Sequence, residues 1–368
     1  MTERPHDVLD DPGALSARDP EGMLDAVEGA GIQWEEAASA ALGFRGPAAW
    51  RDLRAVVVAG MGGSAIAGDM AASYLSRRWP VRLQVVRDYR LPAWADRGTL
   101  LVASSYSGGT EETLSLWEEA GRRGMPRAAL TTGGVLGAEA EAAGVPLLAL
   151  PPGLQPRAAL PSSLVGLLAL LGRVGPAGPR SPGGEETLAE VRETGRVLRA
   201  LPEEWGRESP SDGNPAKEAA LWIGRGLPVI YGPEYPLAPV VTRWRGQLGE
   251  NAKHLAWGNV LPEMNHNEIV GWEAQEELYP RMRVLFLEDE DQSDRMALRT
   301  RITRELVERA GARVWSARGS GEGLLSRMIS LAALADYTSV YLACGWGVDP
   351  TPVEKIDYLK SQLTEDPS

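Results

Sequence analysis

This sequence of 368 residues has almost no cysteine and no run of basic residues, and both features are informative. The chain has one cysteine, Cys344, so no disulfide can form within it, and a reducing compartment fits best. Acidic residues outnumber basic ones by 50 to 38, and no block of Lys or Arg occurs. This charge gives no support to binding of nucleic acid or of an anionic membrane. A bound anion must be held by backbone N–H groups and a few placed cations.

Long apolar runs and metal-binding patterns are also missing. The longest apolar runs, such as residues 164–171, are too short to cross a bilayer. Residues 1–20 contain Asp, Glu and Pro around no apolar centre, so we expect no signal peptide there. The 3 histidines are scattered, and neither paired cysteines nor a His-x-x-x-His spacing is present. We therefore expect a cytoplasmic protein with no metal site and no cofactor.

Apolar strand-like runs alternate with helical segments along most of the chain. In the first half, strands are predicted at residues 54–59, 81–87, 99–103, 127–131 and 146–150. In the second half they are predicted at 227–231, 283–287, 312–316 and 339–342. Continuous apolar strands separated by helices are typical of parallel sheets covered on both faces. The sequence therefore predicts an α/β fold.

The length and the turn-rich stretches indicate two domains. The clearest linker is the stretch GPAGPRSPGG at residues 175–184. We expect a first α/β domain at 51–175, a linker with a helix at 176–215, and a second α/β domain with a C-terminal segment at 216–368. Ahead of them, residues 1–50 are expected to hold a loose tail over 1–20 and one or two helices over 21–43.

Two turns rich in Gly, Ser and Thr each join a predicted strand to a helix in the first half. They are GMGGS at residues 60–64 and SSYSGGT at 104–110. Glycines let the backbone approach an anion, helix N-termini attract it, and hydroxyl groups can donate to phosphate oxygens. Each turn alone also fits an ordinary tight turn, and Thr110 alone fits a helix N-cap.

Both turns are expected at the carboxyl ends of neighbouring parallel strands, where open α/β sheets bind ligands. We therefore predict a phosphate site there. Its predicted contacts are Gly63, Ser64, Ser105, Ser107 and Thr110. A third turn, at residues 131–134, is a candidate to join them.

These motifs resemble a known family. Residues 62–69 (GGSAIAGD) and 105–113 (SYSGGTEET) are similar to the sugar isomerase (SIS) domain. More narrowly, they resemble the bifunctional phosphoglucose/phosphomannose isomerases of archaea and some bacteria. That family commonly has Asn where this chain has Gly108, a mild departure. Three further matches, PPGLQPRAAL at 151–160, GENAK at 249–253 and EMNHNEI at 263–269, extend the resemblance to the second half.

The resemblance implies two SIS-type αβα sandwiches and a cofactor-free isomerase that interconverts glucose 6-phosphate, and mannose 6-phosphate, with fructose 6-phosphate through a cis-enediolate. It makes Glu250 the carboxylate base and Arg157 the residue that stabilises the enediolate. It makes His266 the proton donor and acceptor for the ring oxygen, contributed by the neighbouring subunit of a homodimer. A C-terminal lysine, placed at Lys360 rather than Lys355, would help to open the sugar ring.

The residues themselves leave other interpretations open. Glu250 lies on a predicted helix around residues 239–257, with Arg243 and Gln247 on the same face, which also suits an exposed, salt-bridged surface. Arg157 by itself fits a surface arginine, and His254 a structural histidine. Two other functions compete with the isomerase. One is a non-catalytic sugar-phosphate-binding or regulatory protein, and the other is a SIS enzyme of different chemistry, such as an aminosugar isomerase.

Overall fold

Two parallel β-sheets organise the protein in a computed structural model that describes residues 4–365. In spatial order, the first sheet contains β2 (Arg82–Val86), β1 (Ala55–Ala59), β3 (Thr99–Ser104), β4 (Arg127–Thr131) and β5 (Leu147–Ala149). The second contains β7 (Trp257–Leu261), β6 (Leu227–Pro233), β8 (Met282–Glu288) and β9 (Arg313–Arg318). Every strand pairing is parallel. The predicted α/β class with two parallel-sheet sandwiches is confirmed.

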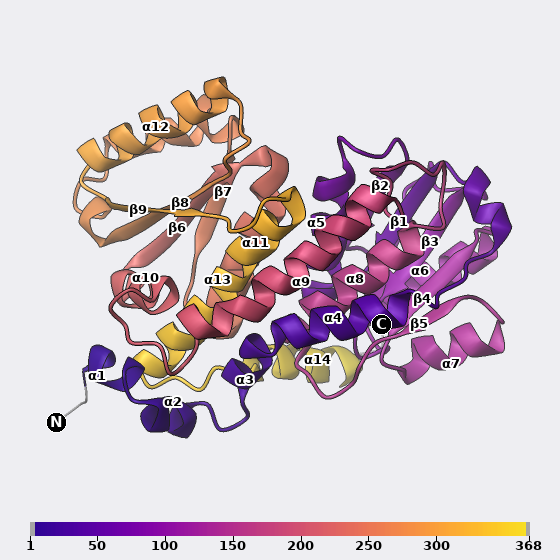
Figure 1. Ribbon diagram of the computed structural model, residues 1–368, viewed down its shortest axis with the longest axis horizontal. Helices are drawn as coiled ribbons and strands as arrows, with labels where there is room; N and C mark the ends of the chain where they lie inside the picture. Colours follow the sequence, from indigo (N-terminus) through magenta and orange to yellow (C-terminus); the bar gives the residue numbers. More distant parts are fainter. Residues whose placement is uncertain (1–3, 366–368) are drawn as a thin grey trace.

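Helices cover both sheets and fill the space between them (Figure 1). The N-terminal part forms α1 (Pro5–Leu9), α2 (Pro12–Arg18), α3 (Met23–Glu28) and α4 (Ala30–Ala41). The first half continues with α5 (Gly62–Leu75), α6 (Glu111–Arg122), α7 (Gly134–Ala142) and α8 (Leu160–Leu171). The remaining helices are α9 (Glu185–Trp205), α10 (Pro215–Ile223), α11 (Glu234–Glu250), α12 (Asp294–Arg309), α13 (Leu324–Gly345) and α14 (Glu354–Glu365). Short 3₁₀ segments include η2 (Pro156–Ala158) and η3 (Glu263–His266).

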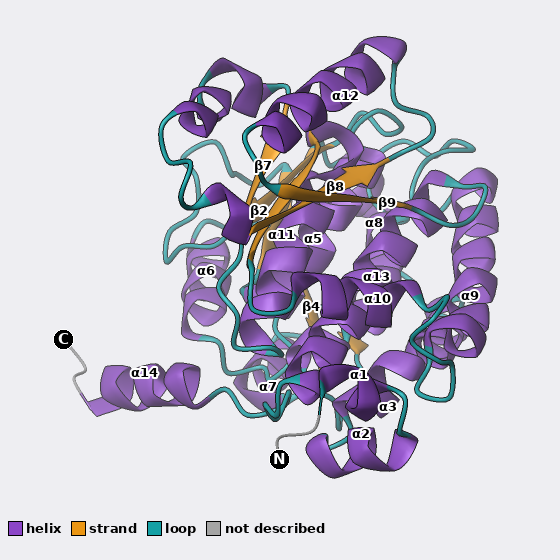
Figure 2. Ribbon diagram, turned by 90° about the vertical axis from the view of Figure 1, so that its left-hand side faces the viewer, coloured by secondary structure: helices purple, strands orange, loops and turns teal. Residues whose placement is uncertain are grey.

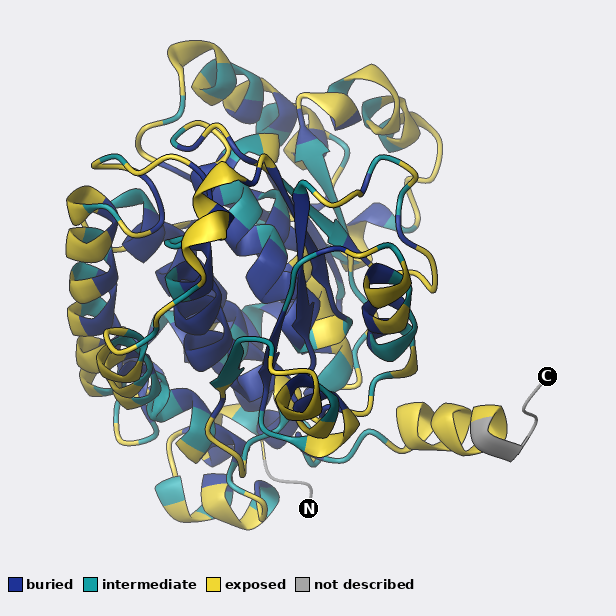
Figure 3. Cartoon of the chain, turned by 90° about the vertical axis from the view of Figure 1, so that its right-hand side faces the viewer, coloured by how far each residue is buried: buried dark blue, intermediate teal, exposed yellow. Residues whose placement is uncertain are grey.

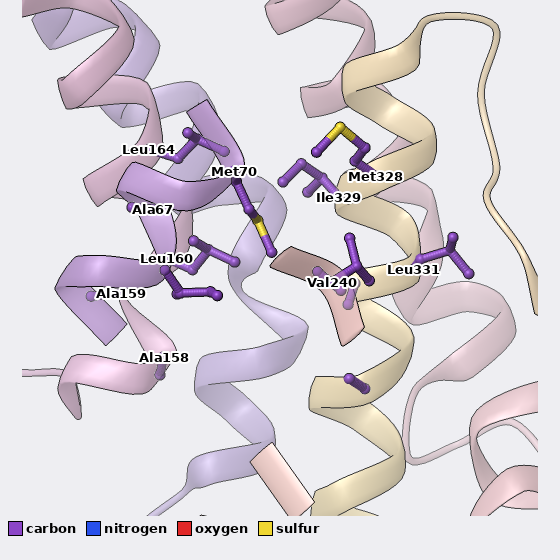
Figure 4. Close-up of a cluster of buried hydrophobic side chains, with 14 of the residues drawn as sticks. Ala67, Met70, Ala158, Ala159, Leu160, Leu164, Val240, Met328, Ile329 and Leu331 are labelled. Atoms are coloured by element: carbon purple, nitrogen blue, oxygen red, sulfur yellow. The ribbon is translucent and has the colours of Figure 1, made fainter. Parts of the chain in front are cut away.

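The central core lies where helices from the two halves meet. Helices α5 and α8 come from the first half, and α11 and α13 from the second, and their apolar side chains pack in one cluster. Figure 4 shows Met70 of α5 pointing toward Val240 of α11 and Ile329 of α13. This packing holds the carboxyl edge of the first sheet against α11, and so joins parts of the chain that are far apart in sequence.

The N-terminal residues are helical where the sequence predicted a loose tail. Two short helices, α1 and α2, occupy most of residues 5–18, and each begins with proline, whose fixed φ suits the first turn of a helix. The Asp11 carboxylate caps α2 by accepting from the N–H groups of Gly13 and Ala14. The prediction of a loose tail over residues 1–20 is therefore wrong for the part that the structure describes.

The predicted strand at residues 339–342 is also wrong, because these residues lie inside α13. Nearly every residue of this helix is buried, so its sequence lacks the one-sided apolar pattern of a surface helix. Its β-branched and aromatic residues then mimic a strand. Helix α13 is long and apolar enough to span a membrane, but 94% of its most apolar window is buried inside the protein. It is the central core helix of this fold.

The end of a predicted helix is instead a turn and a loop that lead into β7. Helix α11 ends at Glu250, although the sequence suggested helix as far as residue 257, and the chain then enters β7. The strand sequence WGNVL contains Gly and Asn, both poor strand formers, so it carries little β signal. The correction matters for the site because it makes Glu250 the last residue of its helix.

Candidate active site

The two Ser/Thr loops lie side by side, because β1 and β3 are neighbours in the first sheet. The N–H of Tyr106 donates to Ser64 Oγ over 3.2 Å, which joins the second loop to the first. Ser105 Oγ and Thr110 Oγ1 are 2.9 Å apart. Thr110 occupies the N-cap position of α6, but its side chain makes no capping hydrogen bond. Its hydroxyl is turned toward Ser105 instead, so the simple N-cap interpretation of this residue does not hold.

The loops therefore meet at the carboxyl edge of the sheet, beside the first turns of α5 and α6. The first N–H groups of a helix have no acceptors within the helix and are free to bind an anion. Ser107 is exposed in the second loop, whereas Ser64 and Ser105 are buried. The geometry gathers the predicted phosphate contacts into one place that remains accessible on one side.

The third predicted turn supports the second loop. The backbone N–H and the hydroxyl of Thr132 both donate to the carbonyl of Tyr106, over 3.1 and 2.8 Å. Gly108 has a φ of +69°, and a Cβ on it would lie 1.9 Å from the carbonyl oxygen of Gly133. Only glycine fits here, because any side chain would push the third turn away. In this chain the close packing therefore requires glycine at position 108.

The segment that carries Arg157 packs against both loops. A Cβ on Gly63 would lie 2.5 Å from the carbonyl oxygen of Pro156 and 3.1 Å from the Cα of Arg157. The Tyr106 hydroxyl donates to the carbonyl of Pro151 over 2.8 Å and accepts from the N–H of Leu154 over 3.0 Å. The two Ser/Thr loops thus fix the backbone of the arginine-bearing segment directly.

The Arg157 guanidinium is only 3% exposed and is held on two sides. Its Nε donates to Asn251 Oδ1 over 2.6 Å, and its Nη2 donates to the carbonyls of Pro350 and Thr351 over 3.0 and 2.7 Å. Its Nη1 lies 3.8 Å from Glu250 Oε2. Burial lowers the pKa of Arg157, and the negative charge of Glu250 opposes that shift. The interpretation of Arg157 as a surface arginine is wrong.

Glu250 is half-buried at the end of α11. Arg243 and Gln247, which share its predicted helix face, are buried at 4% and 2% exposure, so this face is not a solvated salt-bridged surface. The charged partner that lies nearest in this arrangement is Arg157, 93 residues away in the sequence. The pairing of a carboxylate with a buried guanidinium, beside the edge predicted to bind phosphate, suits proton transfer next to a developing negative charge.

Lys253 and Asn251 belong to the site although the sequence analysis gave them no role. Lys253 has a φ of +52°, and its Nζ donates to the carbonyls of Glu250, Asp349 and Pro350 over 2.9, 2.8 and 3.0 Å. It therefore ties the end of α11 to the loop that accepts hydrogen bonds from Arg157. Partial burial and the nearby Arg157 charge lower the pKa of Lys253. The only sequence signal was their presence in the GENAK motif.

The remaining predicted residues do not join this cluster within one chain. Glu250 precedes β7 and His266 follows it in η3, and a strand of 5 residues spans about 16 Å. The two side chains therefore lie toward opposite ends of the second sheet. Lys360 is on α14, which extends away from the body of the protein and is exposed over residues 354–363 (Figure 2 and Figure 3). His254, expected to be structural, lies beyond α11, and its Nε2 is 2.7 Å from the Gly226 carbonyl.

Comparison with known proteins identifies the family. The chain is 41% identical to a bifunctional phosphoglucose/phosphomannose isomerase of Caldicellulosiruptor bescii, over 85% of this chain and 91% of that protein. It is 35% identical to the protein of the same name from Aquifex aeolicus, over 89% and 98% of the two chains. The chain belongs to the bifunctional phosphoglucose/phosphomannose isomerase family. The resemblance carried by the sequence motifs is confirmed.

Two further comparisons concern the C-terminal domain and the fold. The family model of the bacterial phospho-glucose isomerase C-terminal SIS domain matches residues 212–363. The crystal structure of a glucose-6-phosphate isomerase like protein from Thermus thermophilus superposes with a TM-score of 0.61 at 20% identity, over 96% of this chain and 99% of that one. At that identity the likeness concerns the fold alone, and it agrees with the SIS architecture.

Substitution of Gly63 by alanine tests the contact between the phosphate loop and the arginine segment. The added Cβ would clash with Pro156 and Arg157 backbone atoms, which cannot swing aside as a side chain can. We expect Gly63→Ala to lower catalytic efficiency by about tenfold or more, because displacement of Arg157 by a fraction of an ångström weakens its contacts. Steady-state kinetics on purified Gly63→Ala protein measure this effect.

Gly246→Ala is the matched control. Gly246 is exposed on α11, and nothing lies within 4 Å of its added Cβ. Alanine favours helix over glycine, so this variant should keep its activity and its thermal stability. Equal activity in Gly63→Ala and Gly246→Ala would show that the contact between the loop and the arginine segment is not needed.

Proposed function

We propose that this protein interconverts fructose 6-phosphate with glucose 6-phosphate and with mannose 6-phosphate, through a cis-enediolate. The observation that carries the proposal is the Glu250 carboxylate beside the buried Arg157 guanidinium, 3.8 Å apart, next to the Ser/Thr loops. A fixed carboxylate can take the proton from C1 or C2, and a fixed cation can stabilise the negative oxygen that results. The names of the relatives that share this family support the same pair of substrates.

The loops are proposed to hold the phosphate group. The hydroxyls of Ser64, Ser105, Ser107 and Thr110 and the N–H of Gly63 are donors at one edge of the first sheet. A phosphate bound there contributes to binding in the ground state and in the transition state alike. Its main catalytic effect is to orient the other end of the sugar.

Arg157 is proposed to bind the enediolate oxygen through Nη1. Protein acceptors already engage Nε and Nη2, whereas Nη1 has no hydrogen-bond acceptor among the described residues and lies 3.8 Å from Glu250 Oε2. Formation of mannose 6-phosphate requires the enediolate to rotate about C2–C3 and to be protonated on its other face. The small side chain of Thr351, beside Arg157, is compatible with that rotation.

His266 is proposed to act across a homodimer. Leu255, Trp257 and Val270 are 75%, 50% and 60% exposed near β7, which is an edge strand of the second sheet. A second copy that covered this edge would bury these apolar side chains. Two edge strands related by a two-fold axis perpendicular to the sheet run antiparallel, and in that arrangement the Glu250 end of one would lie beside the His266 end of the other.

Lys360 is proposed to reach the site when α14 packs against another surface. Ile356, Leu359 and Leu363 follow the i, i+3, i+7 spacing of one helix face, and all three are exposed. Lys360 lies four residues after Ile356, so it shares this face. Docking of the apolar face in a dimer would carry the Lys360 ammonium with it toward the site. For the compartment we retain the cytoplasm, where the single buried Cys344 would stay reduced.

Incubation of the purified protein with fructose 6-phosphate, in deuterated water and with EDTA, tests the reaction. We expect both glucose 6-phosphate and mannose 6-phosphate to appear in NMR spectra, with deuterium at C2. Binding of the sugar phosphate without turnover would instead favour a non-catalytic sugar-phosphate-binding protein. Formation of glucose 6-phosphate alone would contradict the mannose half of the proposal. Turnover of an aminosugar phosphate alone would indicate a SIS enzyme of different chemistry.

A further inference from the structure

Arg157 is held by its main chain and by its side chain, and both supports trace back to helix α13. The carbonyl of Arg157 accepts a hydrogen bond from Arg243 Nη2 over 2.6 Å. Its guanidinium donates to Asn251 over 2.6 Å. Arg243 and Asn251 are themselves fixed by α13, through Asp336 and Ser339.

The main-chain support depends on a buried ion pair. Arg243 donates through Nε and Nη2 to the two carboxylate oxygens of Asp336, over 2.9 Å each. The side chains are 3% and 15% exposed, and a two-point guanidinium–carboxylate contact fixes the plane of both groups. Arg243 lies seven residues before Glu250, about two turns earlier on the same face of α11. One rigid helix therefore carries both the residue that holds Arg157 and the proposed base.

The side-chain support depends on the orientation of a buried amide. Asn251 is fully buried, and its Oδ1 accepts from Arg157 while its Nδ2 donates to Ser339 Oγ over 2.9 Å. Ser339 in turn donates to the carbonyl of Asp336 over 2.9 Å, one turn earlier on α13. The hydroxyl of Ser339 thus keeps the amide oxygen of Asn251 turned toward the guanidinium.

We propose that Asp336 and Ser339 are positioning residues for the isomerase reaction, which set the main chain and the side chain of Arg157 against Glu250. This inference rests on the proposed function. In this proposal neither residue contacts the substrate, and each acts on Arg157 through one intermediate residue, Asp336 through Arg243 and Ser339 through Asn251. Arg157 is proposed to act on charge that develops in the transition state, so its displacement should lower kcat. KM should change little, because the Ser/Thr loops bind the phosphate.

Ser339→Ala and a control from the same helix turn test the proposal. Thr338 is also buried, but its hydroxyl has no hydrogen-bond partner among the residues described, so Thr338→Val removes no support. We expect Ser339→Ala to lower kcat about tenfold with KM within about twofold of wild type, and Thr338→Val to keep both constants within about twofold. A similar loss of kcat in both variants would overturn the proposal.

A double-mutant cycle with Arg157→Lys separates positioning from general disturbance. Lysine cannot use the support from Asn251 in the same geometry, so Ser339→Ala should cost less than about twofold in that background. An equal fold-loss in both backgrounds would contradict action through Arg157. Asp336→Asn gives a second cycle if it folds, although it leaves Arg243 buried without its counter-charge. Absence of turnover by the wild-type protein would refute the proposed function itself. If the wild type turns over but the fold-losses in kcat of the two single variants multiply in the double variant, only this inference is refuted.

Discussion

Replacement of Glu250 by glutamine is expected to lower kcat about 10³-fold, while the affinity for fructose 6-phosphate stays within about twofold. The amide has nearly the shape of the carboxylate but cannot accept the proton from C1 or C2. The proposed phosphate contacts lie on the loops of the first sheet and not on α11, so binding should survive. Deuterium entry at C2 should fall together with kcat, because both depend on the same proton transfer.

The control for this experiment is Glu234→Gln, which neutralises an exposed carboxylate at the opposite end of α11. It makes the same chemical change at the start of α11, before the non-helical residue Tyr235 and away from Arg157, so its kinetics should match the wild type. Retention of most activity in Glu250→Gln would exclude Glu250 as the base. Loss of substrate binding together with kcat would indicate that Glu250 acts mainly in binding.

The first sheet was predictable from sequence because its local signals agree. Its strands are short apolar runs. The central strands β1 and β3 end in turns that contain more glycines and hydroxyl side chains than a simple turn requires. In the second half the signals conflict. Helix α13 is buried on all sides and so has no periodicity, and β7 contains residues that disfavour strands. The errors therefore fall where tertiary packing, rather than local preference, decides the structure.

The candidate site shows the same division between local and long-range information. The phosphate loops could be predicted from residue types, whereas Arg157 and Glu250 were named only through the family resemblance. Their contact depends on α5 packing against α11 and on α11 packing against α13, which no local pattern encodes. The hydrogen bonds from Asp336 and Ser339 could not be predicted from the sequence, because its pattern assigned residues 339–342 to a strand. In a strand, the side chains of residues 336 and 339 would point to opposite faces and could not hold both Arg243 and Asn251.

The proposed homodimer makes a sharp complementation experiment possible. His266→Ala and Glu250→Gln chains, carrying different affinity tags, are co-expressed, and the mixed dimer is isolated through both tags. If each site combines Glu250 of one chain with His266 of the other, the mixed dimer has one intact site and one doubly defective site. Its activity should then be about half that of the wild-type dimer, although each parent dimer is nearly inactive.

The alternative arrangement gives the opposite result. If both residues acted within one chain, each site of the mixed dimer would lack one of them, and its activity would not exceed that of the parents. The separation of Glu250 and His266 by the length of β7 argues for the shared site. The shared site would also be ruled out if light scattering at the assay concentration showed a monomeric wild-type protein that is fully active. In that case the exposed side chains of Leu255, Trp257 and Val270 would need another partner.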